Sequence, residues 1–165
     1  MFFAVCAITL LCLMSVSRAA PLACEDSVRP PDRLDPRHLV GRWAMVAGSL
    51  NHLPLLEWFK QRDSASVNFS NSTSDTAVSY SSSIRLGGTC LHHSYNISLK
   101  GGRFTYDGTH ESNLTMNFVR TSCRDCTLMR MNAESGKRQH FYLFSRRREV
   151  DQEEMEEFRA QGQNN

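Results

Sequence analysis

The feature that most constrains the fold is a series of eight short strand-like runs that follow one another at short intervals. Each run is rich in β-branched and aromatic residues and is bounded by turn residues. Gly87-Gly88, Gly101-Gly102 and Asp107-Gly108 separate several of them and are hairpin signals. Sequential hairpins form an up-and-down antiparallel sheet, which avoids exposed edges by closing into a barrel. The predicted strands are 42–47, 64–70, 76–86, 90–99, 103–106, 113–120, 126–132 and 138–146.

The stretch after the eighth strand predicts a C-terminal helix. Asp151 is placed to cap it, and Glu154, three residues on, is the reciprocal acid of a capping box. Met155 and Phe158 share one face, and Gly162 fits the C-terminal cap. The predicted fold class is therefore all-β, an eight-stranded up-and-down barrel with one helix packed on its wall.

The start of the chain has the pattern of a secretory signal peptide. An apolar run at 2–14 is followed by Ser17-Arg18-Ala19, with small residues at the −3 and −1 places of a cut after Ala19. No later stretch is long and apolar enough to span a membrane. We therefore expect a secreted, extracellular protein with a signal peptide at 1–19, an irregular N-terminal arm at 20–40, and the barrel with its helix at 41–165.

Charge and cysteine content limit the partners and the chemistry. With 19 basic and 17 acidic residues, the chain gives no reason to expect nucleic acid as a partner. The expected mature chain keeps four cysteines, which in an oxidising compartment form disulfides with three pairings open. The C-x-x-C at 123–126 is not expected to be a redox motif, because the βαβ setting of such motifs is absent. It is not expected to bind zinc either, because a second pair of ligands is absent. The four cysteines are Cys24, Cys90, Cys123 and Cys126.

Four Asn-x-Ser/Thr sequons predict surface glycans, and they also indicate which face of each strand points inward. A glycan cannot face a core, and strand residues alternate sides, so the neighbours of a sequon asparagine point into the barrel. In three strands those neighbours are the apolar residues. In each of the last two strands the pattern does not decide which face points inward. In the seventh strand the inward set is either Thr127, Met129 and Met131, or Leu128 and Arg130. In the eighth strand it is either His140, Tyr142 and Phe144, or Phe141 and Leu143. The sequon asparagines are Asn68, Asn71, Asn96 and Asn113.

The inward residues suit either a filled core or a pocket for one small ligand, because an eight-stranded barrel has room for either. The apolar stretch 49–60, with a helical turn beginning near Pro54, is expected to lie as a lid at the barrel mouth. We find no catalytic set, metal site or cofactor site. The predicted ligand contacts are Trp58, Phe69, Tyr80, Ile84, His93, Tyr95, Phe104, Tyr106, Met116 and Phe118.

Gly41-Arg42-Trp43 at the first strand, eight meandering strands and a helix after the eighth together resemble the lipocalins. In that family the Gly-x-Trp tryptophan closes one barrel end, and an arginine at the end of strand eight packs over it. By this resemblance Gly41, Trp43 and Arg146 are structural. The family's Thr-Asp-Tyr motif between strands six and seven is missing, and Thr121-Ser122-Cys123 stands near that place.

Within the lipocalins the chain looks like the alpha-1-acid glycoprotein and apolipoprotein M group. Closer still, it looks like the pufferfish saxitoxin- and tetrodotoxin-binding proteins and the fish tributyltin-binding proteins. The residues that carry this match are 20–26, 41–50 and 134–160. The resemblance implies a secreted plasma glycoprotein that carries a small molecule.

One departure from these relatives concerns the disulfides. The relatives continue past the helix into a cysteine-containing tail that pairs with two barrel cysteines, which by match are Cys24 and Cys90. This sequence stops at Asn165 without such a cysteine, so the tail is lost or the sequence is truncated. Cys90 shares the outward face with Asn96, and Cys24 is then its remaining candidate partner outside the C-x-x-C.

The leading hypothesis is a carrier of a hydrophobic compound, an organotin or a guanidinium toxin. Aromatic faces attract cations, but no acid lies on the inward list, which counts against strong toxin binding. His93 could coordinate an organotin, although a lone inward histidine is more often hydrogen-bonded structure. Lipids and steroids suit the barrel equally well.

Two other functional classes are weighed against a carrier. One is an interaction glycoprotein with a filled barrel, in which the arginines at 146–148 could bind a polyanion. The other is an enzyme such as a prostaglandin isomerase, which would use an inward cysteine. Since Cys90 faces outward, we expect no enzymatic activity.

Overall fold

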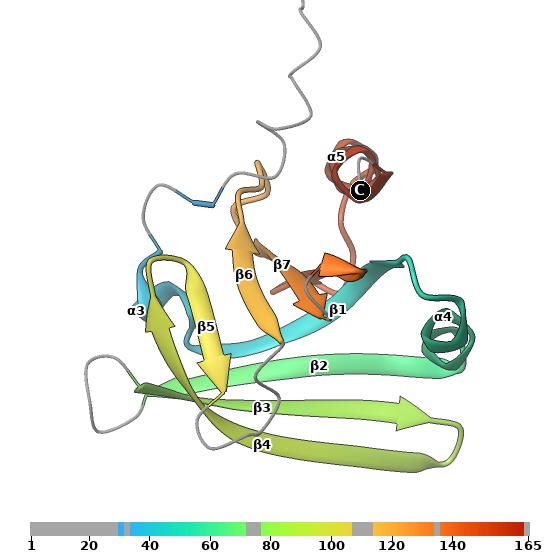
Figure 1. Ribbon diagram of the computed structural model, residues 1–165, viewed down its shortest axis with the longest axis horizontal. Helices are drawn as coiled ribbons and strands as arrows, with labels where there is room; N and C mark the ends of the chain where they lie inside the picture. Colours follow the sequence, from blue (N-terminus) through green and yellow to red (C-terminus); the bar gives the residue numbers. More distant parts are fainter. Residues whose placement is uncertain (1–29, 32–33, 72–76, 107–113, 134–135, 164–165) are drawn as a thin grey trace, which may run out of the picture.

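The eight predicted strands close into one antiparallel barrel, in which each strand pairs with its sequence neighbours and β8 pairs back onto β1. The computed structural model describes residues 30–31, 34–71, 77–106, 114–133 and 136–163. Figure 1 shows the meander of strands, with helices α3, α4 and α5 outside it. The predicted fold class is confirmed. The strands are β1 Gly41–Leu50, β2 Arg62–Asn71, β3 Ala77–Leu86, β4 Thr89–Lys100, β5 Arg103–Tyr106, β6 Thr115–Val119, β7 Cys126–Ala133 and β8 Arg138–Ser145.

The strand boundaries differ from the predicted ones at a few ends. β6 is described only from Thr115 to Val119, shorter than the expected 113–120, and β8 ends at Ser145, one residue early. β1 runs three residues further than expected, to Leu50, with a register shift against β8 between Met45 and Ala47. β2 begins two residues early, at Arg62, and its register against β3 shifts between Arg62 and Ser64.

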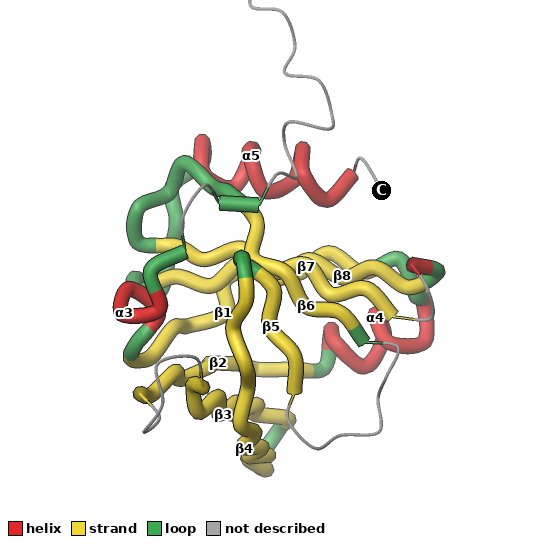
Figure 2. The backbone as a smooth tube through the Cα atoms, turned by 60° about the vertical axis from the view of Figure 1, so that its left-hand side comes forward, coloured by secondary structure: helices red, strands yellow, loops and turns green. Residues whose placement is uncertain are grey.

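Helix α5, Gln152–Gln163, lies across the barrel wall (Figure 2). The predicted capping box is present, because Asp151 N donates to Glu154 Oε2 and Glu154 N donates to Asp151 Oδ1, both at 2.9 Å. The prediction that Gly162 caps the C-terminus is wrong, since the helix continues to Gln163. Gly162 instead allows close packing, because a Cβ there would lie 3.0 Å from the Ser49 side chain.

Side chains on the two faces of the barrel wall form separate cores. Phe158 and Met155 of α5 pack with Leu128, Phe141 and Leu143 on the outside of β7 and β8. The other face of these strands therefore points inward. This decides the alternatives that the sequence left open: the inward side chains include Met129 and Met131 in β7, and Tyr142 and Phe144 in β8. The buried interior core contains Leu39, Trp43, Val67, Phe69, Val78, Tyr80, Ile97, Phe104, Met116, Phe118, Met129, Tyr142 and Phe144.

Part of the expected irregular arm forms a short helix, α3, Pro36–Leu39. The Asp35 side chain accepts from Arg37 N at 2.9 Å and so caps this helix. Leu39 is buried in the interior core, and its carbonyl accepts a hydrogen bond of 2.7 Å from Trp43 Nε1. Helix α3 therefore covers the end of the barrel at which β1 begins. The domain limits and the signal peptide stay predictions, because residues 1–29 lie outside the described residues.

Arg146, which directly follows β8, closes the same end of the barrel. Its guanidinium lies 3.8 Å from the centre of the fully buried Trp43 ring. Its Nη2 donates to the carbonyls of His38 and Val40 at 2.9 and 2.6 Å, and its Nη1 donates to the carbonyl of Arg42 at 3.1 Å. Gly41, with φ +107°, is held against the guanidinium, since a Cβ there would lie 2.7 Å from Nη1.

The cysteines fall into one disulfide and one exposed thiol among the described residues. Cys123 and Cys126 form a disulfide at the bend between β6 and β7. Cys90 is free and exposed, which agrees with its outward parity, and Cys24 lies outside the described residues. Asn68 and Asn96 are exposed, while the side chains of Asn71 and Asn113 are not described. Glycan attachment stays a prediction at all four sequons.

No helix within the described part of the chain has the length and apolar character that a bilayer crossing requires.

The Arg146→Lys variant tests the closure. A lysine cannot present a planar fork to three carbonyls and cannot stack on Trp43 in the same way, so we expect the free energy of unfolding to fall by about 1–3 kcal/mol. Urea unfolding measures it. The exposed Arg148→Lys is the matched control and should stay within about 0.5 kcal/mol of the parent. Equal midpoints for both variants would contradict the role given to Arg146.

Candidate functional site

The closed half of the barrel is filled by five of the ten predicted ligand contacts. Phe69 contacts Tyr80 and Phe118, and Phe104 contacts Tyr80 and Phe118, with ring centroids 5.3 to 6.3 Å apart. With Met116 these side chains are almost wholly buried. Their packing therefore leaves little of their surface accessible to a ligand. Their role as ligand contacts stays a prediction.

The remaining predicted contacts lie nearer the opposite end of the barrel. Tyr106 is half-buried at the edge of the interior core and meets Tyr95 edge to face at 5.0 Å. Tyr95 and His93 stack on each other, but both are exposed, Tyr95 by 37%. Their exposure follows from the short β5, whose described pairing with β4 begins only at Ile97. Ile84 is half-buried and lies outside the interior core.

Helix α4, Leu53–Lys60, occupies the mouth (Figure 1). β1 and β2 pair only from Gly41 to Ala44, and beyond that point the two strands separate. The predicted helical turn in the apolar stretch is thus a helix of eight residues, which bridges the separated ends. It buries none of its side chains fully, and Leu53 is 73% exposed.

Phe59 anchors α4 to the barrel. Its ring lies directly on Gly48 of β1, where a Cβ would collide with it, and 6.0 Å from the ring of Tyr142 inside the barrel. Gly48 is therefore the residue that allows the lid to lie this close. A cavity of about 160 Å³ opens beside Phe59 and is lined by the facing ends of β1 and β2.

Arg62 is the mouth residue that the sequence analysis missed. Its guanidinium lies 4.2 Å from the centre of the Trp58 ring and 4.7 Å from that of Phe59, and it lines the small cavity. Burial lowers the pKa of Arg62, and the nearby Tyr142 and Tyr80 partly offset this. The group still carries its charge at neutral pH. Its Nε is buried and has no hydrogen-bond partner among the described residues.

Two histidines join Arg62 at this end. His140 of β8 is only 2% exposed, and its Nδ1 lies 3.3 Å from the hydroxyl of Tyr142. His52 immediately precedes α4. His140 Nε2 and His52 Nδ1 are buried without a partner among the described residues. The mouth therefore gathers three nitrogen atoms that lack hydrogen bonds, a condition that costs free energy unless a ligand or water satisfies them.

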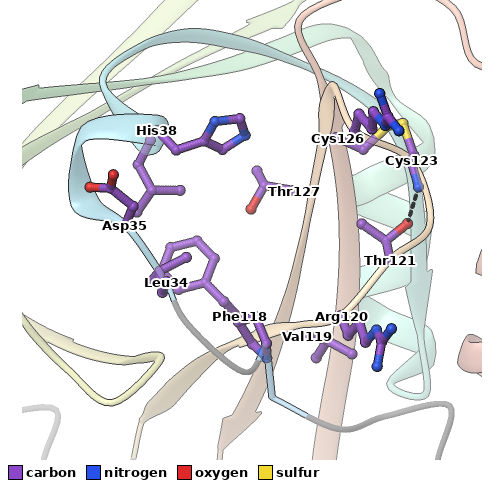
Figure 3. A pocket seen from close by; sticks show the side chains of 13 residues that line it. Leu34, Asp35, His38, Phe118, Val119, Arg120, Thr121, Cys123, Cys126 and Thr127 are labelled. Carbon is purple, nitrogen blue, oxygen red and sulfur yellow. Dashed lines mark hydrogen bonds between the residues drawn. A yellow bond between two sulfur atoms is a disulfide. The ribbon is translucent and has the colours of Figure 1, made fainter.

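A second cavity, of about 410 Å³, lies at the closed end beside α3 and the β6–β7 bend (Figure 3). Asp35, His38, Phe118 and Thr127 line it. Two of its polar side chains are hydrogen-bonded, since Asp35 bonds Arg37 and the Thr121 hydroxyl accepts from Cys123 N at 3.3 Å. This cavity gathers no set of unsatisfied groups, so we place the functional site at the mouth.

The comparisons with known proteins agree with this architecture. The sequence model of the ApoM domain matches residues 27–165. Among solved structures, the chain is similar to the siderocalin Ex-FABP, described as functioning through dual ligand specificities, with a TM-score of 0.61 and 17% identity over 74% of this chain and 83% of that one. This likeness shows the lipocalin fold. No curated protein sequence matches significantly.

The Gly48→Ala variant tests the anchoring of α4. The new methyl group collides with the Phe59 ring, so α4 must move outward, and stability should fall by about 1–3 kcal/mol. Acrylamide quenching should also increase for Trp58, whereas the second tryptophan, Trp43, stays buried. Gly88→Ala is the control, because a Cβ there meets nothing within 4 Å. Unchanged quenching in Gly48→Ala would show that Phe59 does not hold the lid.

Proposed function

The chain belongs to the ApoM domain family, and from that premise we propose that it is a secreted carrier of a small, largely apolar molecule with one anionic end. The apolar body would lie in the mouth half of the barrel, against Tyr106, Met131 and Leu50, which border the interior core. The anionic end would lie at Arg62. Transport needs only reversible burial, so the proposal includes no bond chemistry.

The observation that carries the proposal is the environment of Arg62. Its charged group is half-buried between two aromatic rings and has an unpaired Nε. Asp63, the next residue, also lines the small cavity but is exposed to solvent. An anion at the guanidinium would satisfy the Nε and offset the burial of its charge.

This environment narrows the ligand classes that the sequence suggested. A guanidinium toxin would place a second cation beside Arg62, which is unfavourable. An organotin coordinated by His93 would lie on an exposed ring outside the interior core. An anionic amphiphile fits better, because it pairs the guanidinium and places its apolar body against the aromatic core.

The filled closed half gives some support to the alternative, an interaction protein without a small ligand. Arg146 and Arg147 do not favour the polyanion site considered for that class. Arg146 is bound to three carbonyls, and Arg147 forms a bidentate contact with Glu154 at 2.6 and 2.7 Å. A carrier therefore remains the better proposal, with the ligand in the mouth half.

Dye binding tests the carrier. We expect the purified protein to bind both Nile red, which is uncharged, and 1-anilinonaphthalene-8-sulfonate, which is anionic. Arg62→Gln removes the charge but keeps a polar side chain, so it should weaken sulfonate binding about tenfold or more and Nile red binding by less than about threefold. Fluorescence titration measures both affinities.

Arg85→Gln, on the outer wall, is the control and should change neither affinity. Binding of neither dye would overturn the carrier proposal and favour the filled barrel. An equal loss of both dyes in Arg62→Gln would show that Arg62 does not select for charge. Independently of the dyes, native mass spectrometry of the purified protein before and after organic extraction would give the mass of any carried molecule.

A further inference from the structure

The unsatisfied ring nitrogens of His52 and His140 require a physical explanation. A buried polar atom without a partner is uncommon in folded proteins and costs about 1–3 kcal/mol. Here two such atoms occur on histidines that lie at the same end of the barrel and are close enough for their charges to interact. His140 contacts Tyr142, which in turn lies beside Phe59 and close enough to Arg62 for their charges to interact.

The groups around His140 keep it neutral in the empty site. Burial lowers its pKa, and the positive charges of His52 and Arg138 lower it further. Its other neighbours supply no negative charge: Leu50 and Met131 pair with it across β1 and β7, and burial raises the pKa of Tyr142 to about 12.

Few carboxylates of the described residues lie at this end. On α4, Glu57 bonds Lys60 at 2.9 Å on the exposed side. On β2, Asp63 is exposed at the rim of the small cavity next to Arg62. Neither is among the groups that shift the pKa of His140. The charge-bearing groups that face the imidazole are thus His52 and Arg138, with Arg62 beyond Tyr142.

We propose that His52 and His140 complete, with Arg62, the site for the anionic end of the carried molecule, and that binding the anion brings a proton onto the His140 imidazole. This inference rests on the proposed carrier function and adds to it a coupling between ligand binding and pH. A protonated imidazole donates from both ring nitrogens, so His140 can keep its contact with Tyr142 and still donate to the ligand.

The direction of the coupling follows from the charges. In the empty site, burial and the neighbouring cations favour the neutral imidazole, whereas an anion at hydrogen-bond distance favours the charged form. Binding therefore takes up protons. The affinity for the anion should therefore rise as the pH falls. The rise begins above the imidazole pKa of the complex and ends below the imidazole pKa of the free protein. Its slope is at most about tenfold per pH unit for each proton taken up.

The two dyes separate this inference from the carrier proposal. The sulfonate of 1-anilinonaphthalene-8-sulfonate stays charged throughout, so any change in its affinity comes from the protein. Between about pH 8 and about pH 6 we expect its dissociation constant to fall about threefold or more, while that of Nile red changes by less than about twofold. Calorimetry in two buffers of different ionisation enthalpy should show net proton uptake with the sulfonate alone.

Histidine variants assign the protons. His52→Gln should weaken sulfonate binding, because a buried ring nitrogen of the site is removed. His140→Gln should reduce the pH dependence and the proton uptake. His92→Gln should not, because His92 lies on the outer wall and bonds Ser83 at 2.9 Å. If the buried His140→Gln does not fold, the pH dependence and the calorimetry of the parent protein decide.

Each outcome has one meaning. Sulfonate binding that is independent of pH, or a pH dependence unchanged in His140→Gln, would overturn the coupling and leave the carrier proposal standing. Binding of neither dye would overturn both.

Discussion

The closure of one barrel end by Arg146 is the interaction on which the rest of the structure depends. Its guanidinium satisfies the carbonyls of His38, Val40 and Arg42 and covers Trp43, so one side chain joins the last strand, the first strand and α3. These carbonyls lie where the chain passes from α3 into β1. The pKa of Arg146 is lowered mainly by burial, yet the group keeps its charge, which strengthens its bonds to the carbonyls. With this end sealed, access to the interior is left to the opposite end.

The two ends of the barrel differ in how well their polar groups are satisfied. The closed half is filled by aromatic rings, and α5 holds the adjacent bend through Glu157, which bonds the Ser122 amide and hydroxyl, and through Gln161, which donates to the Arg120 carbonyl. At the mouth, Arg62, His52 and His140 each bury an unpaired nitrogen. Two further unpaired atoms, on Arg130 and Asn132, lie on strand β7 at positions that alternate with the inward Met129 and Met131. Ligand binding would explain the cost of these unsatisfied groups, and this distinguishes the mouth as the proposed site.

Most of the fold could be predicted from the sequence, including a helical turn at the mouth, but the polar groups of the mouth could not, for physical reasons. Strand faces followed from two independent patterns, the sequons and the alternation of apolar residues, and the interior position of Phe69, Ile97 and Phe118 agrees with both. The closing pair of Trp43 and Arg146 followed from a resemblance. Arg62 was missed because the register of β2 shifts between Arg62 and Ser64, so alternation counted from Asn68 does not reach it. Both faces of β8 are apolar, so only the position of α5 could show that His140 points inward.

The two helices explain why the mouth, rather than the wall, is the part of the barrel that can open. Helix α5 buries Phe158 and Gln161 and is joined to the barrel by Glu157 and by the pair of Arg147 and Glu154. Helix α4 buries no side chain fully and depends on Phe59 against Gly48 and on Arg62 between two rings. Local opening is easiest where few apolar contacts are lost, so α4 should separate from the barrel at a lower free-energy cost than α5. A ligand that binds Arg62 would add a contact beneath α4, and the lid would then close over the molecule that it helps to hold.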